Sequence, residues 1–177
     1  MSTTTTCSQR HGAVTFKGDP LTLVGDELKV GEAAPAFSLV ANDLSAKTLA
    51  DYAGKVAVII TVPSLDTPVC DTETRRFNEE AAALGDGVRV LAVSLDLPFA
   101  QKRWCGAAGV ERVETLSDYK EGAFGPAYGL LIKELGLLAR AVIVVDGSGA
   151  IRHFELVKEV TAEPDYDAAL RAAKAAR

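Results

Sequence analysis

The chain has 177 residues, of which 48% are hydrophobic and 24% charged, and its formal net charge is -5. This composition is typical of a globular protein, and the length predicts one domain with a sizeable core. The net negative charge, with basic residues spread along the chain, speaks against nucleic acid or an anionic membrane surface as a partner.

The beginning of the chain carries no recognisable membrane or export signal. Residues 1–8 read MSTTTTCS, which lacks the basic and apolar regions of a secretory signal and any lipid-attachment motif. No window approaches the roughly 20 continuous apolar residues that a transmembrane helix needs. We therefore expect a cytoplasmic protein. We also expect residues 1–12 to form a flexible extension, because no apolar periodicity anchors them, and residues 13–177 to form the single domain.

Most of the chain alternates between strand-like and helical segments. Apolar alternation from Ala13 to Leu23 around a polar loop predicts an N-terminal β-hairpin. The other strand-like segments are 37–40, 56–62, 88–94, 113–116, 141–145 and 151–156. The helical segments are 49–52, 70–84, 98–105 and a final helix opened by Pro164, with an ambiguous segment at 121–128.

The order of these segments predicts an α/β fold. A strand, a helix and a second strand between residues 56 and 94 imply a parallel crossover, and the turn DGSG at 146–149 predicts a second hairpin. Together they predict a mixed central sheet with flanking helices on both faces. A thioredoxin-like sheet meets this description.

Cys70 lies where a buried strand meets a helix. Residues 63–70 read PSLDTPVC, in which Thr67 suits the N-cap and Pro68 the first helical position. Cys70 is then the third helical residue, where the N-cap hydroxyl ordinarily points and where the helix dipole is positive. Cysteines at a helix N-terminus beside a cation have pKa values of about 3.5 to 7.5, against about 8.5 for a free thiol. The pattern favours a thiolate nucleophile over a buried structural cysteine.

A thiolate at Cys70 needs a positive charge from elsewhere in the chain. Its neighbours Asp66, Asp71 and Glu73 are acidic, and spacing does not choose among the 19 Lys and Arg residues. Arg140 is attractive because it immediately precedes the apolar strand 141–145 and would lie at a sheet end. On this ground alone, a solvated arginine is the more common arrangement.

Other kinds of site find little support in the residues. Cys105 follows Cys70 by 35 positions, too far for a Cys-x-x-Cys redox pair and without the doublets of zinc sites. Cys7, His11 and His153 likewise lack the close ligand spacing of a metal site. We expect no metal and no organic cofactor. Two other interpretations of the cysteines remain, a redox-sensing binding protein and a thioredoxin-type disulfide oxidoreductase. The second would need another cysteine at the start of the Cys70 helix.

The motif at 63–70 resembles the P-x-x-x-T-x-x-C signature of the peroxiredoxins. Residues 98–109, PFAQKRWCGAAG, are similar to the resolving-cysteine helix of the thiol peroxidase group, the atypical two-cysteine peroxiredoxins. The segments ARAV at 139–142 and EPDY at 163–166 also match that group. The resemblance covers nearly the whole chain from about Ala13, and only the extension with Cys7 departs from it.

The resemblance implies an antioxidant enzyme that reduces hydrogen peroxide and organic hydroperoxides. It implies that Cys70 is the peroxidatic thiolate, which becomes a sulfenic acid, and that Cys105 is the resolving thiol, which forms an intramolecular disulfide with Cys70. Thr67 and Arg140 would orient Cys70, and Pro63 would shield the pocket from water. The family further implies thioredoxin as the reductant, a homodimer, and local unwinding of both cysteine helices when the disulfide forms.

Overall fold

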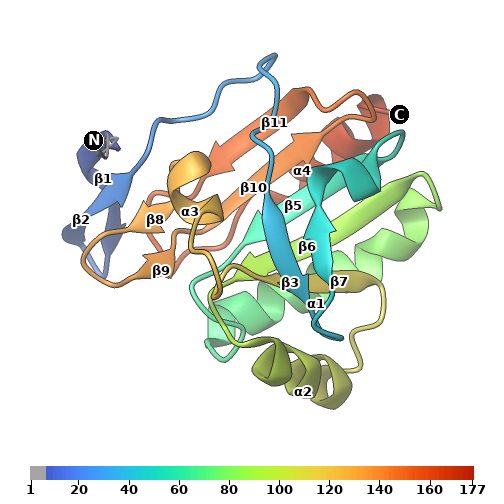
Figure 1. Cartoon of the computed structure of the whole chain (residues 1–177), viewed down its shortest axis with the longest axis horizontal. Coiled ribbons are helices and arrows are strands. Elements are labelled where there is room, and N and C mark those ends of the chain that lie inside the picture. Colours follow the sequence, from blue (N-terminus) through green and yellow to red (C-terminus); the bar gives the residue numbers. More distant parts are fainter. Residues whose placement is uncertain (1–6) are drawn as a thin grey trace, which may run out of the picture.

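A seven-stranded mixed sheet runs through the computed structural model, which describes residues 7–177 (Figure 1). Its strands follow the spatial order β11-β10-β5-β6-β7-β3-β4. They are β3 (Ser38–Ala41), β4 (Ala46–Thr48), β5 (Val56–Thr61), β6 (Val88–Ser94), β7 (Val113–Ser117), β10 (Ala141–Val145) and β11 (Ile151–Leu156). The helices are α1 (Pro68–Leu84), α2 (Pro98–Ala108), α3 (Phe124–Ala127) and α4 (Tyr166–Ala175), with a 3-10 turn, η1, at Leu49–Tyr52. The predicted α/β sheet of thioredoxin type is confirmed.

The centre of the sheet is built from two parallel crossovers. β5, β6 and β7 pair in parallel, and α1 and α2 connect them. Side chains of β5 alternate between the two faces, with Val58 and Ile60 packed toward the helices and Ala57 and Ile59 toward the other side. All four are at most 1% exposed, which explains why this strand is a continuous apolar run.

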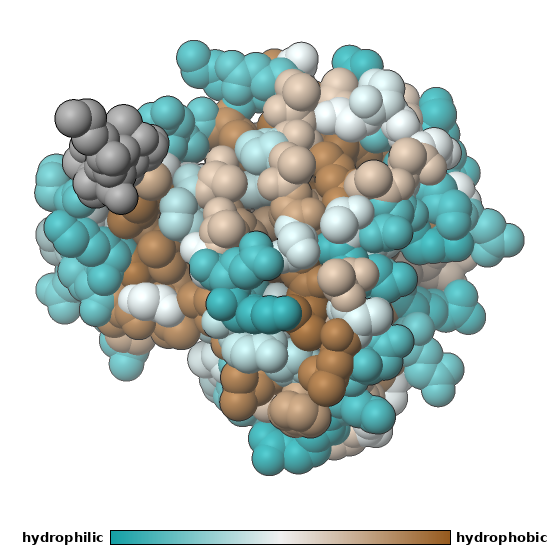
Figure 2. Space-filling model, viewed as in Figure 1, coloured by the Kyte–Doolittle hydropathy of each residue, from teal (hydrophilic) through white to brown (hydrophobic). Residues whose placement is uncertain are grey.

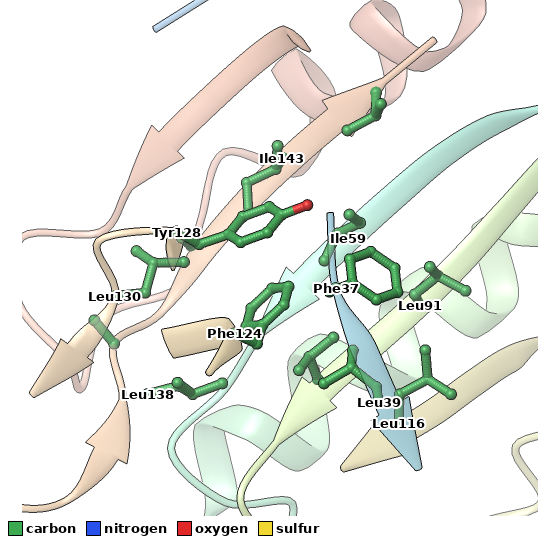
Figure 3. Packing of buried hydrophobic residues seen from close by; sticks show 14 of the residues in the cluster. Phe37, Leu39, Ile59, Leu91, Leu116, Phe124, Tyr128, Leu130, Leu138 and Ile143 are labelled. Atoms are coloured by element: carbon green, nitrogen blue, oxygen red, sulfur yellow. The ribbon is translucent and has the colours of Figure 1, made fainter. Parts of the chain in front are cut away.

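The three long helices lie on one face of the sheet, so the expectation of helices on both faces is only partly right. Phe77 of α1, Trp104 of α2 and Ala169 of α4 belong to the same core cluster. The two crossovers step along the sheet in the same direction and have the same handedness, which places their helices together. In Figure 3, Phe124 and Tyr128, from α3 and the residue that follows it, pack on the opposite face, where their stacked rings have centroids 4.1 Å apart.

A second sheet packs against the core cluster on that opposite face. Its order is β1-β2-β8-β9, and its strands are β1 (Gln9–Phe16), β2 (Asp19–Val24), β8 (Leu131–Ile132) and β9 (Leu137–Leu138). β1 and β2 form the predicted N-terminal hairpin. β8 and β9 have two residues each, too few for an alternation pattern to predict them.

The hairpin begins four residues earlier than the sequence predicts. Residues 9–12, assigned above to a flexible extension, belong to β1. Arg10 explains the difference, because its Nε donates to the carbonyl oxygen of Gly25 at 3.0 Å and its Nη1 pairs with Glu27 at 3.0 Å. Cys7 is exposed, and residues 1–6 of the predicted extension lie outside the described residues.

The ends of the helices follow from capping and glycine residues. Asp165 caps α4 by accepting from the backbone N–H of Ala168 at 2.9 Å. α2 continues past Gly106, its predicted end, and stops at Gly109, where φ is 65°. An isolated glycine is tolerated within a helix, whereas a left-handed glycine ends one. Among residues 7–177, no helix combines the length and apolar character that crossing a membrane requires.

Candidate active site

Cys70 is the third residue of α1, just beyond the loop that leaves β5. Thr67 is the N-cap and Pro68 the first helical residue, as predicted. The Cys70 side chain is fully buried, with 0% exposure. The first N–H groups of an α-helix have no intrahelical acceptor, and the helix dipole favours negative charge beside them. The local structure therefore places the sulfur where a thiolate is stabilised.

The Thr67 hydroxyl does not cap the helix, which corrects the expectation that it points at the N–H of Cys70. It donates instead to the carbonyl oxygen of Ser64 at 3.1 Å, and the Thr67 N–H donates to the same oxygen at 3.2 Å. No side-chain capping bond forms at the start of α1. Both bonds close the turn at 64–67, which competes with the helix for the hydroxyl. The N–H of Cys70 is left without its expected acceptor.

Asp96 fixes the loop that precedes α1. Its carboxylate accepts hydrogen bonds from Ser64 Oγ at 2.7 Å, from the N–H of Leu65 at 2.8 Å and from Ser94 Oγ at 2.8 Å. Pro63 is buried in the same loop. β5 and β6 are parallel neighbours, so their carboxyl ends meet at one edge of the sheet. Polar residues directly after two adjacent parallel strands are a sequence signal that points to such a contact.

Arg140 reaches Cys70 from the strand on the other side of β5. β10 pairs antiparallel with β5, with Ala141 opposite Thr61, so the start of β10 meets the end of β5. Nη2 of Arg140 donates to Sγ of Cys70 at 3.2 Å. Nε and Nη2 also donate to the carbonyl oxygen of Val160 at 3.2 and 3.1 Å, and Arg140 is only 1% exposed. The sheet thus brings the candidate cation to the candidate thiolate and holds it there.

Glu73 completes this group, although its place in the sequence suggests only an acidic neighbour that repels a thiolate at Cys70. Its buried carboxylate forms an ion pair with Nη1 of Arg140. Cys70, Glu73, Thr74 and Phe77 form the buried face of α1, at the i, i+3, i+4 and i+7 spacing of one helical side. A carboxylate on the buried face of a helix is the sequence signal that could have identified Glu73 as the partner of a buried cation, because buried charges are almost always paired.

The buried pair has unusual acid–base properties. Burial raises the pKa of Glu73 to about 7, against the attraction of Arg140, which lowers it. Burial also disfavours the charged form of Arg140, but Glu73 and Cys70 outweigh that effect and raise its pKa. Within residues 7–177, Oε1 of Glu73 receives no hydrogen bond. Glu73 therefore changes its charge near neutral pH while Arg140 stays positive.

Replacing Glu73 with glutamine should remove a pH dependence of stability between about pH 4.5 and pH 7. The folded chain binds the Glu73 proton more tightly than the unfolded chain does, so the free energy of unfolding falls as pH rises through this window. One pKa unit corresponds to about 1.4 kcal/mol, so wild type should lose about 2 kcal/mol relative to Glu73→Gln between about pH 5 and pH 7.5. Urea unfolding of both reduced proteins measures the difference. If the free energy of unfolding changed with pH in the same way in both proteins, the raised pKa of Glu73 would be contradicted.

Cys105 lies apart from this group, in the last turn of α2. Its Sγ is 3.5 Å from Oγ1 of Thr115 on β7, and that hydroxyl donates to Oδ1 of Asn42 at 3.0 Å. A cavity of about 390 Å³, lined in part by Lys47, opens beside the half-buried thiol. All three cysteines are free, and Cys70 and Cys105 pack in the same core cluster. The structure therefore places Pro63, Thr67 and Cys70 in one loop and helix start with Arg140 bonded to the sulfur, and gives the second thiol other partners.

Known proteins share both the sequence and the fold of this chain. The redoxin family model matches residues 29–170. A thiol peroxidase of Halalkalibacterium halodurans is 58% identical over 164 residues, which cover 93% of this chain and 98% of that protein. A thiol peroxidase of Bacillus subtilis is 57% identical over 162 residues, covering 92% and 96%. The crystal structure of a peroxiredoxin-like protein from Aquifex aeolicus matches with a TM-score of 0.88 and 47% identity, covering 94% of this chain and 98% of that one. The chain belongs to the redoxin family and, within it, to the thiol peroxidases, which are oxidoreductases of peroxiredoxin type.

Proposed function

We propose that this thiol peroxidase reduces hydrogen peroxide and organic hydroperoxides through a Cys70 sulfenic acid and a Cys70–Cys105 disulfide, and that thioredoxin recycles it. The observation that carries the proposal is the 3.2 Å hydrogen bond from the buried guanidinium of Arg140 to the sulfur of Cys70. A fixed positive charge beside a cysteine at a helix N-terminus is the arrangement that activates a thiol as a nucleophile.

In the first step, the Cys70 thiolate attacks the outer oxygen of the hydroperoxide. The O–O bond breaks, the sulfur becomes a sulfenic acid, and water or an alcohol leaves after taking up a proton. Negative charge grows on the departing oxygen, where the Arg140 guanidinium and the uncapped N–H of Cys70 can donate to it. Because Arg140 is already held by Val160 and Glu73, little reorganisation accompanies the reaction.

Two further residues of the predicted site support this step indirectly. Thr67 closes the turn at 64–67 through Ser64, so we propose that it orients Cys70 by shaping the loop. Pro63 is buried at the start of that loop, which supports its proposed role in keeping water from the sulfur. Neither role requires a direct bond to Cys70.

In the second step, the Cys105 thiol attacks the sulfenic sulfur of Cys70. The S–O bond breaks, water leaves, and a disulfide forms, which a thioredoxin dithiol then reduces by exchange. A disulfide requires the two Cα atoms to lie within about 7 Å, with the thiols directed at each other. Cys105 instead contacts Thr115, and both cysteines lie in helices, so we propose that the first turn of α1 and the last turn of α2 unwind. The steps use only thiols of the two proteins, without metal or organic cofactor.

The assembly and location are proposed from the family and from the surface. Leu97, Phe99 and Tyr119 are large apolar residues with 52%, 66% and 43% exposure, at the carboxyl edge of β6 and β7. Figure 2 shows hydrophobic residues gathered at the bottom of the molecule, where α2 lies in Figure 1. We propose a homodimer whose interface covers this surface. Sedimentation of the reduced protein tests whether it is a dimer. A cytoplasmic location fits free thiols and a thioredoxin system.

A coupled assay tests the proposed reaction. Wild-type protein with thioredoxin, its reductase and either hydrogen peroxide or a small organic hydroperoxide should consume many equivalents of peroxide. Without reductant, one equivalent should yield a disulfide between the peptides of Cys70 and Cys105, detected by mass spectrometry. A protein that is oxidised once, and then consumes no more peroxide in the presence of thioredoxin, would instead be the redox-sensing alternative.

A further inference from the structure

The residues next to the two cysteines are hydrogen-bonded to each other across α1 and α2. Asp71 follows Cys70 on α1, and Trp104 precedes Cys105 on α2. Nε1 of Trp104 donates to Oδ1 of Asp71 at 2.9 Å, and Trp104 is only 8% exposed. Bonds to a charged carboxylate are among the stronger hydrogen bonds in proteins. Any movement that separates the start of α1 from the end of α2 has to break the hydrogen bond between Trp104 and Asp71.

Arg75 makes a second link between the same two helices. Its Nε donates to Oδ2 of Asp71 at 2.8 Å, and its Nη1 donates to the carbonyl oxygen of Ala108 at 2.8 Å. Its guanidinium carbon lies 5.9 Å from the centre of the Trp104 ring, within cation–π range. Ala108 is the last residue of α2, where carbonyl groups lack intrahelical donors. We call Asp71, Arg75, Trp104 and the Ala108 carbonyl the interhelix clamp.

The clamp holds α1 and α2 in a register that keeps the two thiols on different partners. Three contacts between the helices or their ends join residues 33 positions apart, so the helices run side by side in the same direction. The pairs are Asp71 and Trp104, Arg75 and Ala108, and Asn78 and Glu111. In this register, Sγ of Cys70 accepts from Arg140 and Sγ of Cys105 contacts Thr115.

We propose that the interhelix clamp keeps the Cys70 sulfenic acid from Cys105 and so divides it between two fates, an inference that rests on the proposed function. In the first fate, Cys105 attacks the sulfenic sulfur, the S–O bond breaks, water leaves and the disulfide forms. In the second, the sulfenate sulfur attacks another hydroperoxide, whose O–O bond breaks to give a sulfinic acid and water or an alcohol. The first fate requires the clamp to open. The second takes place in the folded site.

Replacing Trp104 with phenylalanine keeps an aromatic ring and removes the N–H that closes the clamp. We expect disulfide formation to become about three- to tenfold faster, the effect of losing one hydrogen bond to a partly exposed carboxylate. The share of sulfinic acid at a given hydroperoxide concentration should fall by a similar factor. The first oxidation of Cys70 should keep its rate, because Arg140 still holds the sulfur. Rapid-quench alkylation with intact-mass analysis measures all three quantities.

Two further variants make the test specific. Arg75→Met removes the second link from a side chain that is 45% exposed, and should change the partition in the same direction by a smaller factor. Glu80→Gln breaks an exposed 3.5 Å ion pair with Arg76 within α1 and should leave the partition unchanged. If Trp104→Phe does not fold, Arg75→Met decides the outcome.

Unchanged or slower disulfide formation in the clamp variants would overturn the inference. So would an equal acceleration in Glu80→Gln, because the effect would then reflect general weakening of α1. Hydrogen exchange gives an independent readout, since an open clamp should speed exchange of the hydrogen-bonded amides near the start of α1 in the reduced state, beginning with Asp71, whose N–H donates to the carbonyl oxygen of Thr67 at 3.0 Å. A wild type without Cys70-dependent peroxide consumption would overturn the proposed function instead, so the two failures are distinguishable.

Discussion

Replacing Cys70 with serine should abolish peroxide consumption, with a fall of about 10³-fold or more in the rate of the first oxidation. A serine hydroxyl stays protonated at neutral pH, even beside the Arg140 guanidinium that lies 3.2 Å from the sulfur. The change is small in volume and lies in a fully buried position, so the fold should persist. Peroxide consumption with thioredoxin as reductant, together with thermal unfolding, checks both parts.

The two other cysteines supply matched controls for Cys70→Ser. Cys105→Ser should consume the first equivalent of hydroperoxide at the wild-type rate but form no disulfide, because Cys105 faces Thr115 and takes part only after the sulfenic acid has formed. Its Cys70 sulfenic acid is then open only to further oxidation to the sulfinic acid, which ends turnover. Cys7→Ser should behave as wild type, since Cys7 is exposed in the segment before β1. A Cys105→Ser protein that fails to consume the first equivalent would require the two proposed roles to be exchanged.

Local patterns predicted the elements that hold the sulfur. Thr67 and Pro68 mark the start of α1, and the apolar runs of β5 and β10 mark buried strands. These features depend on backbone preferences and burial within a few residues, which a sequence displays directly. The direction of the Thr67 hydroxyl could not be predicted in this way, because a backbone donor, the N–H of Cys70, and a backbone acceptor, the carbonyl of Ser64, compete for it within one turn.

Contacts between distant segments were beyond the reach of local patterns. Arg140 lies 70 residues from Cys70, and their contact depends on the antiparallel pairing of β10 with β5. Glu73 looks repulsive beside Cys70 until that arginine is placed. The Asp71–Trp104 bond likewise depends on the register of two helices that lie on the same face. Sequence spacing alone did not decide which cation contacts Cys70 or which acceptor binds the N–H of Trp104. The pairing of the strands and the packing of the helices decide both.

Replacing Arg140 with methionine should slow the first oxidation of Cys70 by about 10² to 10³-fold, the typical effect of removing one preorganised donor from a developing negative charge. Arg140→Lys should fall between methionine and wild type. A single ammonium cannot reach Cys70, Glu73 and the carbonyl of Val160 together, as the arginine fork does. Peroxide consumption in the first turnover of each variant measures the effect.

Loss of stability must be separated from loss of chemistry in Arg140→Met. Removing one partner of a buried ion pair costs about 3 to 5 kcal/mol where the other stays charged, which for Glu73 is the case at high pH. Without the attraction of Arg140, the pKa of Glu73 should rise further, since that attraction is what opposes burial. The folded variant then binds the Glu73 proton more tightly, so its loss of stability should be smaller at low pH and grow as pH rises.

The double variant Arg140→Met with Glu73→Leu decides between the two explanations. It replaces a buried ion pair with two apolar side chains, an exchange that is often neutral or stabilising for a fold. We expect it to regain most of the free energy of unfolding lost in Arg140→Met, yet to remain as slow in the first oxidation, because neither side chain stabilises the thiolate or the departing oxygen. Recovery of the oxidation rate along with stability would show that Arg140 acts on the fold alone and would remove it from the proposed reaction.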